Sequence, residues 1–124
     1  MYPNKVIVAP AFRSALEAKS YISNMDIFMG ARMHSTIGAI SSGVVTIPFS
    51  YCHKFESLYS KINYPYIISA TKISTEMALE KVKQWISNPN VLKKEGDIAV
   101  EKARNELLSF KEDLKNTIKK KGLL

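Results

Sequence analysis

Short apolar runs alternate with amphipathic stretches along most of the chain. The apolar runs are rich in β-branched residues and are bounded by Pro, Gly or polar residues, which is typical of buried strands. They lie at residues 5–10, 26–29, 44–49 and 66–69. Apolar residues at helical spacing lie between and after them, near residues 14–24, 33–42, 55–62 and 74–88. The pattern predicts strands and helices in strict alternation.

Capping signals mark the ends of the predicted helices. Ser14 and Glu17 have the spacing of a capping box, and Ser74 precedes another apolar helical pattern. Gly43 is placed to close the second helix, and Pro89 follows the last of the four. These residues support the boundaries that the hydrophobic pattern suggests.

The alternation predicts an α/β fold, because parallel strands need crossover helices between them. We expect a Rossmann-like parallel sheet with helices on both faces, occupying residues 1–90 and carrying any functional site. From about Asp97 the pattern changes to a long amphipathic helix, and we expect residues 91–124 to form a helical extension. Its apolar stripe comprises Val100, Ala103, Leu107, Phe110, Leu114 and Ile118. That stripe could cover this domain, a second domain or another copy of the chain.

Composition indicates an ordinary globular protein, with 46% hydrophobic and 10% aromatic residues. There is no apolar run long enough to span a membrane, and no secretory signal is recognisable. Cys52 is the single cysteine, so an internal disulfide is excluded. These features predict a cytoplasmic protein.

The net charge of +7 favours anionic partners. Half of the 18 Lys and Arg residues lie in the last quarter of the chain: Lys93, Lys94, Lys102, Arg104, Lys111, Lys115, Lys119, Lys120 and Lys121. The simplest interpretation is a solvated helix face. The alternative is a tail that touches anionic lipid or nucleic acid, although no aromatic residue lies among the last lysines to stack on bases.

The strongest candidate site follows the second predicted strand. Ligands of parallel sheets bind beyond the carboxyl ends of the strands, where a helix start also attracts anions. Here Gly30 would allow close approach of a ligand. Arg32 could bind a carboxylate or phosphate through two hydrogen bonds, and His34 could donate or accept a proton near neutral pH. Ser35 and Thr36 add hydroxyl groups. The alternative is that Arg32 pairs with a neighbour such as Asp26 while His34 lies in the core.

A second cluster follows the third predicted strand and should share the same edge of the sheet. Tyr51, His53 and Lys54 could donate hydrogen bonds to the same anion. The alternative is a surface loop with Tyr51 packed sideways. We interpret Cys52 as a small packing residue, because nothing nearby in the sequence marks it as a nucleophile. Metal ligation is not expected, since the few His and Cys residues lack zinc-site spacing, and no nucleotide-binding Gly-rich motif occurs.

The ordered combination of these motifs resembles the polysaccharide pyruvyl transferase family. The similar segments run from Asp26 through Gly30, Arg32 and His34 to Ile37, then residues 42–44, then residues 51–55. The resemblance extends over about residues 5–89. Val45 departs from it, because the family commonly has proline there.

The resemblance implies transfer of a pyruvyl group from phosphoenolpyruvate to two hydroxyls of a sugar, forming a ketal in exopolysaccharide or cell-envelope synthesis. Arg32 would bind phosphoenolpyruvate, and His34 would be the general acid and base. Gly30, Ser35, Thr36, Tyr51, His53 and Lys54 would be substrate contacts. No cofactor is implied, and the acceptor would be a sugar or a lipid-linked oligosaccharide, met in the cytoplasm or at the inner membrane face.

The resemblance also implies a fold like that of B-type glycosyltransferases, which consist of two Rossmann-like halves. This chain would then be the C-terminal half, inactive alone without the N-terminal half, and free to self-associate through its last helix. One alternative is a nucleotide-sugar glycosyltransferase domain, with Glu56 as the nearest candidate for binding a ribose, although no sequence pattern supports it. The other is a non-catalytic interaction module that uses the basic tail.

Overall fold

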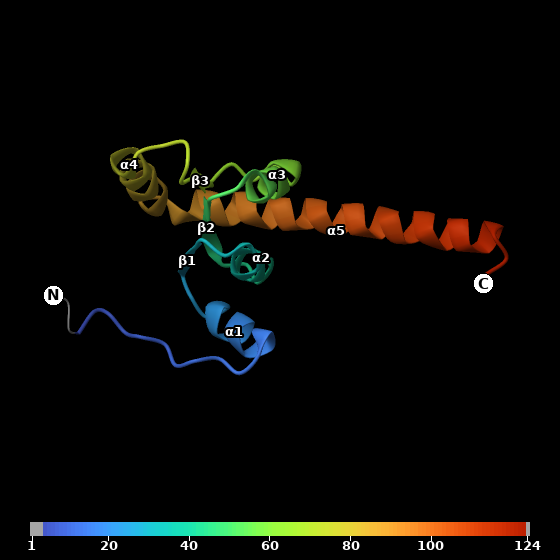
Figure 1. Ribbon diagram of the computed structural model, residues 1–124, viewed down its shortest axis with the longest axis horizontal. Coiled ribbons are helices and arrows are strands. Elements are labelled where there is room, and N and C mark those ends of the chain that lie inside the picture. The colour runs from blue at the N-terminus through green and yellow to red at the C-terminus, as the bar shows by residue number, and fades with distance from the viewer. Residues whose placement is uncertain (1–3, 124) are drawn as a thin grey trace.

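The computed structural model describes residues 4–123 as a small parallel sheet surrounded by helices (Figure 1). Strands β1 (Ile27–Gly30), β2 (Val45–Ser50) and β3 (Ile68–Ser69) lie in the order β1-β2-β3. Both pairings are parallel, with Gly30 opposite Pro48 and Ser50 opposite Ser69. The predicted α/β class is therefore confirmed, and the likeness to a glycosyltransferase half remains a prediction.

Five helices are seen in the described chain: α1 (Ala15–Ile22), α2 (Met33–Ser41), α3 (His53–Lys61), α4 (Thr75–Ile86) and α5 (Pro89–Lys120). The predicted caps are confirmed. The Ser14 hydroxyl accepts from the Glu17 amide at 3.1 Å, and the Ser74 hydroxyl accepts from the Met77 amide at 3.2 Å. Gly43 ends the turn after α2 with φ of +79°, a conformation that glycine adopts without strain.

Both faces of β2 are covered, because its alternating side chains are buried on either side of the sheet. Val45 and Ile47 pack with Ile68 of β3 and Leu92 of α5. Val82 and Trp85 of α4 add to this cluster. The central strand is therefore held in the interior, as the apolar run at residues 44–49 predicts.

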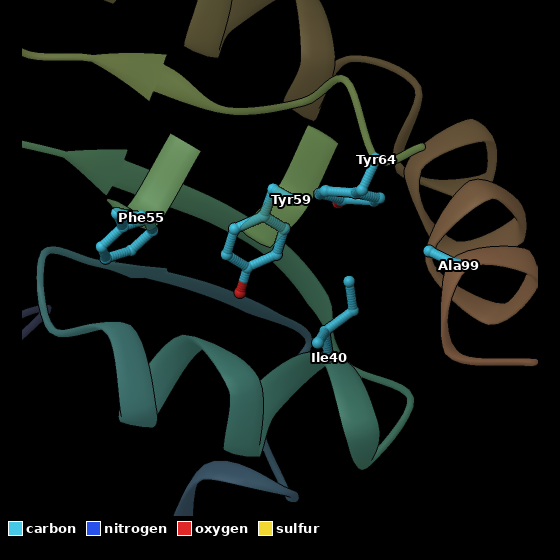
Figure 2. Close-up of a cluster of buried hydrophobic side chains, with 5 residues drawn as sticks. All are labelled: Ile40, Phe55, Tyr59, Tyr64 and Ala99. Carbon is cyan, nitrogen blue, oxygen red and sulfur yellow. The ribbon is translucent and has the colours of Figure 1, made fainter. Parts of the chain in front are cut away.

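A second cluster joins α2, α3 and α5 (Figure 2). It contains Ile40, Phe55, Tyr59, Tyr64 and Ala99, all of them nearly inaccessible to solvent. The aromatic rings of Phe55 and Tyr59 stack at 5.7 Å between centroids, and those of Tyr59 and Tyr64 lie 5.8 Å apart. This packing sets how α3 sits against α2, and so sets the relative position of the two candidate motifs.

The expected first strand at residues 5–10 is not formed. This segment is extended chain without regular pairing, and Figure 1 shows it leading to α1 well away from the sheet. Ile7 and Val8 are 87% and 90% exposed. An apolar, β-branched run becomes a buried strand only when a neighbouring strand supplies hydrogen bonds, and within residues 4–123 no strand pairs with it.

The last helix begins earlier than about Asp97, where the sequence pattern placed its start. Helix α5 begins at Pro89, whose missing N–H costs nothing in the first turn. Its 32 residues make it about 48 Å long, and in Figure 1 its distal half extends past the other elements. None of the helices seen between residues 4 and 123 combines the length and the apolar character needed to cross a bilayer.

Candidate functional site at the carboxyl edge of the sheet

The carboxyl ends of the three strands lie at one edge of the sheet, which we call the carboxyl edge. It is formed where β1 ends at Gly30, β2 at Ser50 and β3 at Ser69. The amide of Ala70 continues the pairing by donating to the Ser50 carbonyl at 2.8 Å. The segments that follow β1 and β2, where the sequence placed its candidate residues, therefore leave the sheet on the same side.

Gly30 is required by packing at this edge. A Cβ atom at this position would lie 2.7 Å from Cε1 of Phe28 and 3.5 Å from Cγ2 of Thr36. The space beside Gly30 is thus occupied by side chains of the chain itself. The structure supports a close approach at Gly30, but the groups that approach it are Phe28 and Thr36.

Arg32 and His34 are both exposed at the start of α2. Arg32 is the N-cap residue, with extended backbone, and no side chain caps the first turn. Among residues 4–123 no ion pair joins Arg32 to Asp26. The alternative of a core histidine at position 34 is wrong, because that side chain faces solvent. A guanidinium and an imidazole are therefore both open to a ligand at one helix start.

The two hydroxyl residues that follow have different surroundings. Ser35 is half-buried and donates to the Arg32 carbonyl at 2.8 Å, which stabilises the helix start. Thr36 is fully buried. Its hydroxyl donates to the Met33 carbonyl at 2.7 Å and accepts from the Tyr59 hydroxyl at 2.8 Å. The expectation that Thr36 contacts substrate is therefore corrected: its hydroxyl holds α2 against α3.

The second cluster lies at the start of α3. His53 and Lys54 are exposed and line a hollow of about 420 Å³ together with Met33 and Ile37 of α2. Met33 belongs to the first turn of α2, so the start of α3 borders that turn. The side chains of Arg32 and His34 are not part of the lining of this hollow.

Tyr51 and Cys52 lie in the short connection before α3. The Tyr51 ring is exposed and is tilted against Phe55, with 6.4 Å between centroids. This arrangement agrees with the sideways packing that we considered as an alternative. Cys52 is the N-cap residue of α3 and is exposed, so its interpretation as a packing residue is wrong.

Sequence reasoning missed an ion-pair cluster at the same edge. Glu56 of α3 accepts a hydrogen bond from the Ser69 hydroxyl and pairs with the Lys72 ammonium at 2.6 Å. The hydrogen bond from Lys72, with that from Ser69, lowers the pKa of the Glu56 carboxyl below its usual value. These residues are far apart in sequence, and only the pairing of β3 with β2 brings them together, so no local signal could have found them.

Glu56 is also the nearest candidate for a ribose-binding carboxylate. Both of its oxygens already have partners, Oε1 with Ser69 and Oε2 with Lys72. This arrangement counts against the nucleotide-sugar alternative. Within the part of the chain that the structure describes, no three His, Cys, Asp or Glu side chains gather into a group suited to a metal ion.

The fold and the edge together define an α/β domain that presents arginine, histidine and lysine side chains beyond the carboxyl ends of parallel strands. Residues 1–53 match the family model of polysaccharide pyruvyl transferase. The resemblance noted from the motifs is confirmed over that range, which includes Gly30, Arg32 and His34 and ends at His53. Residues 54–124 lie outside the match. No curated protein and no solved structure matches the chain.

Proposed function

We propose that this chain carries the phosphoenolpyruvate-binding part of a polysaccharide pyruvyl transferase. The observation that carries the proposal is the exposed pair Arg32 and His34 at the start of α2, inside the matched residues and beside the hollow lined by His53 and Lys54. A small dianionic acid suits such a group of cationic and hydrogen-bonding side chains.

Arg32 binds the carboxylate or phosphate of phosphoenolpyruvate through two parallel hydrogen bonds and holds the molecule in register. It also stabilises negative charge on the phosphate as that group leaves. His53 and Lys54 act as secondary anion contacts, with Tyr51 at the rim. Ser35 contributes by shaping the helix start.

His34 is the general acid in this proposal. It gives a proton to the methylene carbon of phosphoenolpyruvate, which becomes the methyl group of the ketal. One sugar hydroxyl then adds to the adjacent carbon, the C–O bond to phosphate breaks, and the second hydroxyl adds. Of the two hydroxyl protons released, one returns to His34 and the other leaves with phosphate. The products are the pyruvyl ketal and inorganic phosphate.

The acceptor in this proposal is a sugar or a lipid-linked oligosaccharide reached from the cytoplasm. Binding of phosphoenolpyruvate and turnover with an acceptor are tested separately.

Binding is tested by calorimetry with phosphoenolpyruvate, inorganic phosphate as the reference ligand and Arg32→Ala as the variant. Arg104→Ala, on the exposed part of α5, is the matched control for loss of one positive charge. We expect Arg32→Ala to weaken phosphoenolpyruvate binding about tenfold and Arg104→Ala to leave it unchanged. Equal binding by both variants would contradict the role of Arg32.

Chemistry is tested by phosphate release from phosphoenolpyruvate with a range of sugars as acceptors. Robust release that survives His34→Ala would contradict the role of His34. A thermal-shift comparison of phosphoenolpyruvate with nucleotide sugars separates the proposal from the glycosyltransferase alternative. Stabilisation by nucleotide sugars alone would favour that alternative.

A further inference from the structure

One face of α3 is lined with polar side chains and lies next to the proposed phosphoenolpyruvate site. His53, Ser57 and Lys61 recur every fourth residue, so they form one row along the helix. Glu56 and Ser60 lie beside that row, and together with Lys72 from the loop after β3 these residues line a hollow of about 340 Å³. Each residue in this lining has a polar or charged side chain.

This hollow and the one beside α2 share His53, Ser57 and Lys61. The two hollows therefore adjoin on either side of that row, and we call them together the α3 trough. Met33 of α2 borders one of them, and Lys72 borders the other.

The charge of the α3 trough favours an anion. Lys54, Lys61 and Lys72 contribute three positive charges, and His53 adds a fourth when it is protonated. The one acidic group, Glu56, is matched by Lys72 and Ser69. The Lys72 side chain is still 66% exposed, and its ammonium has two further N–H donors free for a ligand. Ser57 and Ser60 supply hydroxyl donors in the same lining.

We propose that the α3 trough is a second anion-binding subsite, distinct from Arg32 and His34, which takes a diphosphate group. A diphosphate suits it better than a single phosphate, because Lys61 and Lys72 line the same hollow and can each contact a different phosphate group. Lys61 and Lys72 at the far end are the residues that distinguish this subsite from the phosphoenolpyruvate site, since only His53 and Lys54 would serve both. The diphosphate could belong to a nucleoside diphosphate or to a prenyl diphosphate.

The test is calorimetric binding of inorganic pyrophosphate to the full chain, with inorganic phosphate as the reference ligand. The variants are Lys61→Gln and Lys72→Gln, and Lys111→Gln on the exposed part of α5 is the matched control. We expect each trough variant to weaken pyrophosphate binding by about threefold to tenfold, and the affinity to fall with added salt. Lys111→Gln should bind as the unaltered chain does, and circular dichroism checks that every variant is folded.

Pyrophosphate binding no tighter than phosphate binding would overturn the proposal, as would equal affinities for the trough variants and the Lys111 control. A uridine diphosphate and a prenyl diphosphate in detergent micelles separate the two sources. Tighter binding of either one, lost in Lys61→Gln, supports the subsite and identifies its ligand. Lys61→Gln and Lys72→Gln should leave phosphoenolpyruvate binding unchanged, whereas Arg32→Ala should weaken it, so failure of the phosphoenolpyruvate proposal would not imitate failure of this one.

Discussion

The Tyr59 hydroxyl donates a hydrogen bond of 2.8 Å to the hydroxyl oxygen of Thr36, 23 residues earlier in the chain. Thr36 donates in turn to the Met33 carbonyl at 2.7 Å. Figure 2 shows Tyr59 reaching from α3 toward α2 within the buried cluster. Two consecutive hydrogen bonds therefore tie α3 to the first turn of α2, the turn that presents Arg32 and His34.

Tyr59→Phe should lower the free energy of unfolding by about 1 kcal/mol, because one buried hydrogen bond is lost while the ring is kept. Urea denaturation at neutral pH measures this difference. Tyr51→Phe is the matched control, because that ring is exposed. Equal losses in the two variants would show that the bond to Thr36 contributes nothing.

Stability should also depend on alkaline pH through Tyr59. Burial raises the pKa of its phenol to about 12, well above the value of about 10 for an exposed tyrosine. The folded state therefore favours the protonated phenol. The stabilisation that comes from the protonated Tyr59 phenol is complete below about pH 10. As the pH rises toward 12 this stabilisation is lost, and the free energy of unfolding falls by about 2 to 3 kcal/mol.

Unfolding free energies measured between pH 9 and 12 check this expectation. Tyr59→Phe should show a shallower decline than the unaltered chain. Some decline should remain, because burial raises the pKa of Tyr64 as well. Parallel curves for the two proteins would contradict a perturbed Tyr59.

Glu56→Gln should loosen the loop between β3 and α4. The carboxylate holds Ser69 and Lys72 to α3, and an amide binds an ammonium more weakly. Hydrogen exchange of residues 70–74 should become faster at neutral pH. Glu80→Gln is the control, since its contact with Lys83 is long, at 3.8 Å, and exposed.

The same loop should loosen in acid without any substitution. The folded state lowers the pKa of Glu56, so the ionised carboxylate stabilises the fold at any pH above the usual pKa range of a glutamate. This stabilisation is lost as the pH falls through the lowered value. The protection factors of residues 70–74, which correct for the pH dependence of intrinsic exchange, should not change over that interval in Glu56→Gln, and a matching acid response in the variant would exclude Glu56 as the cause.

Two glycines near α2 should respond oppositely to alanine. Gly43 has φ of +79°, and a Cβ there would lie 3.2 Å from the Lys93 ammonium, so Gly43→Ala should cost about 1 to 2 kcal/mol. Gly38 lies inside α2, and its nearest neighbour would be Cγ of Lys19 at 3.8 Å. Gly38→Ala should stabilise the protein by about 0.5 to 1 kcal/mol. Calorimetric melting of the two variants should show shifts of opposite sign.

Features that depend on neighbours along the chain were predictable. Ser14 and Ser74 cap α1 and α4 as their spacing with the next turn suggests, because a cap involves only three or four residues. The runs that became β1 and β2 were found for the same reason. Pro89 was interpreted only as a stop after α4, although it also begins α5, because a proline is favourable in a first helical turn.

Features that depend on distant partners were not predictable. The run at residues 5–10 has the composition of a strand but no paired strand beside it. Thr36 looks like a ligand contact from its place after His34, yet it is buried and its hydroxyl oxygen accepts a hydrogen bond from the Tyr59 hydroxyl. The ion pair between Glu56 and Lys72 could not be predicted for the same reason, because no sequence pattern near either residue indicates its partner.

The amino-acid sequence was sufficient to determine the α/β class, the helix caps and the two polar segments that follow β1 and β2. These features depend on hydrophobic periodicity and local hydrogen bonds, which involve only residues close together in the chain. The tertiary structure alone decided which of those polar side chains face solvent and which lie in the core. It also decided that α3 carries a polar row next to α2, because strand order and aromatic packing set the distance between segments that the sequence keeps apart.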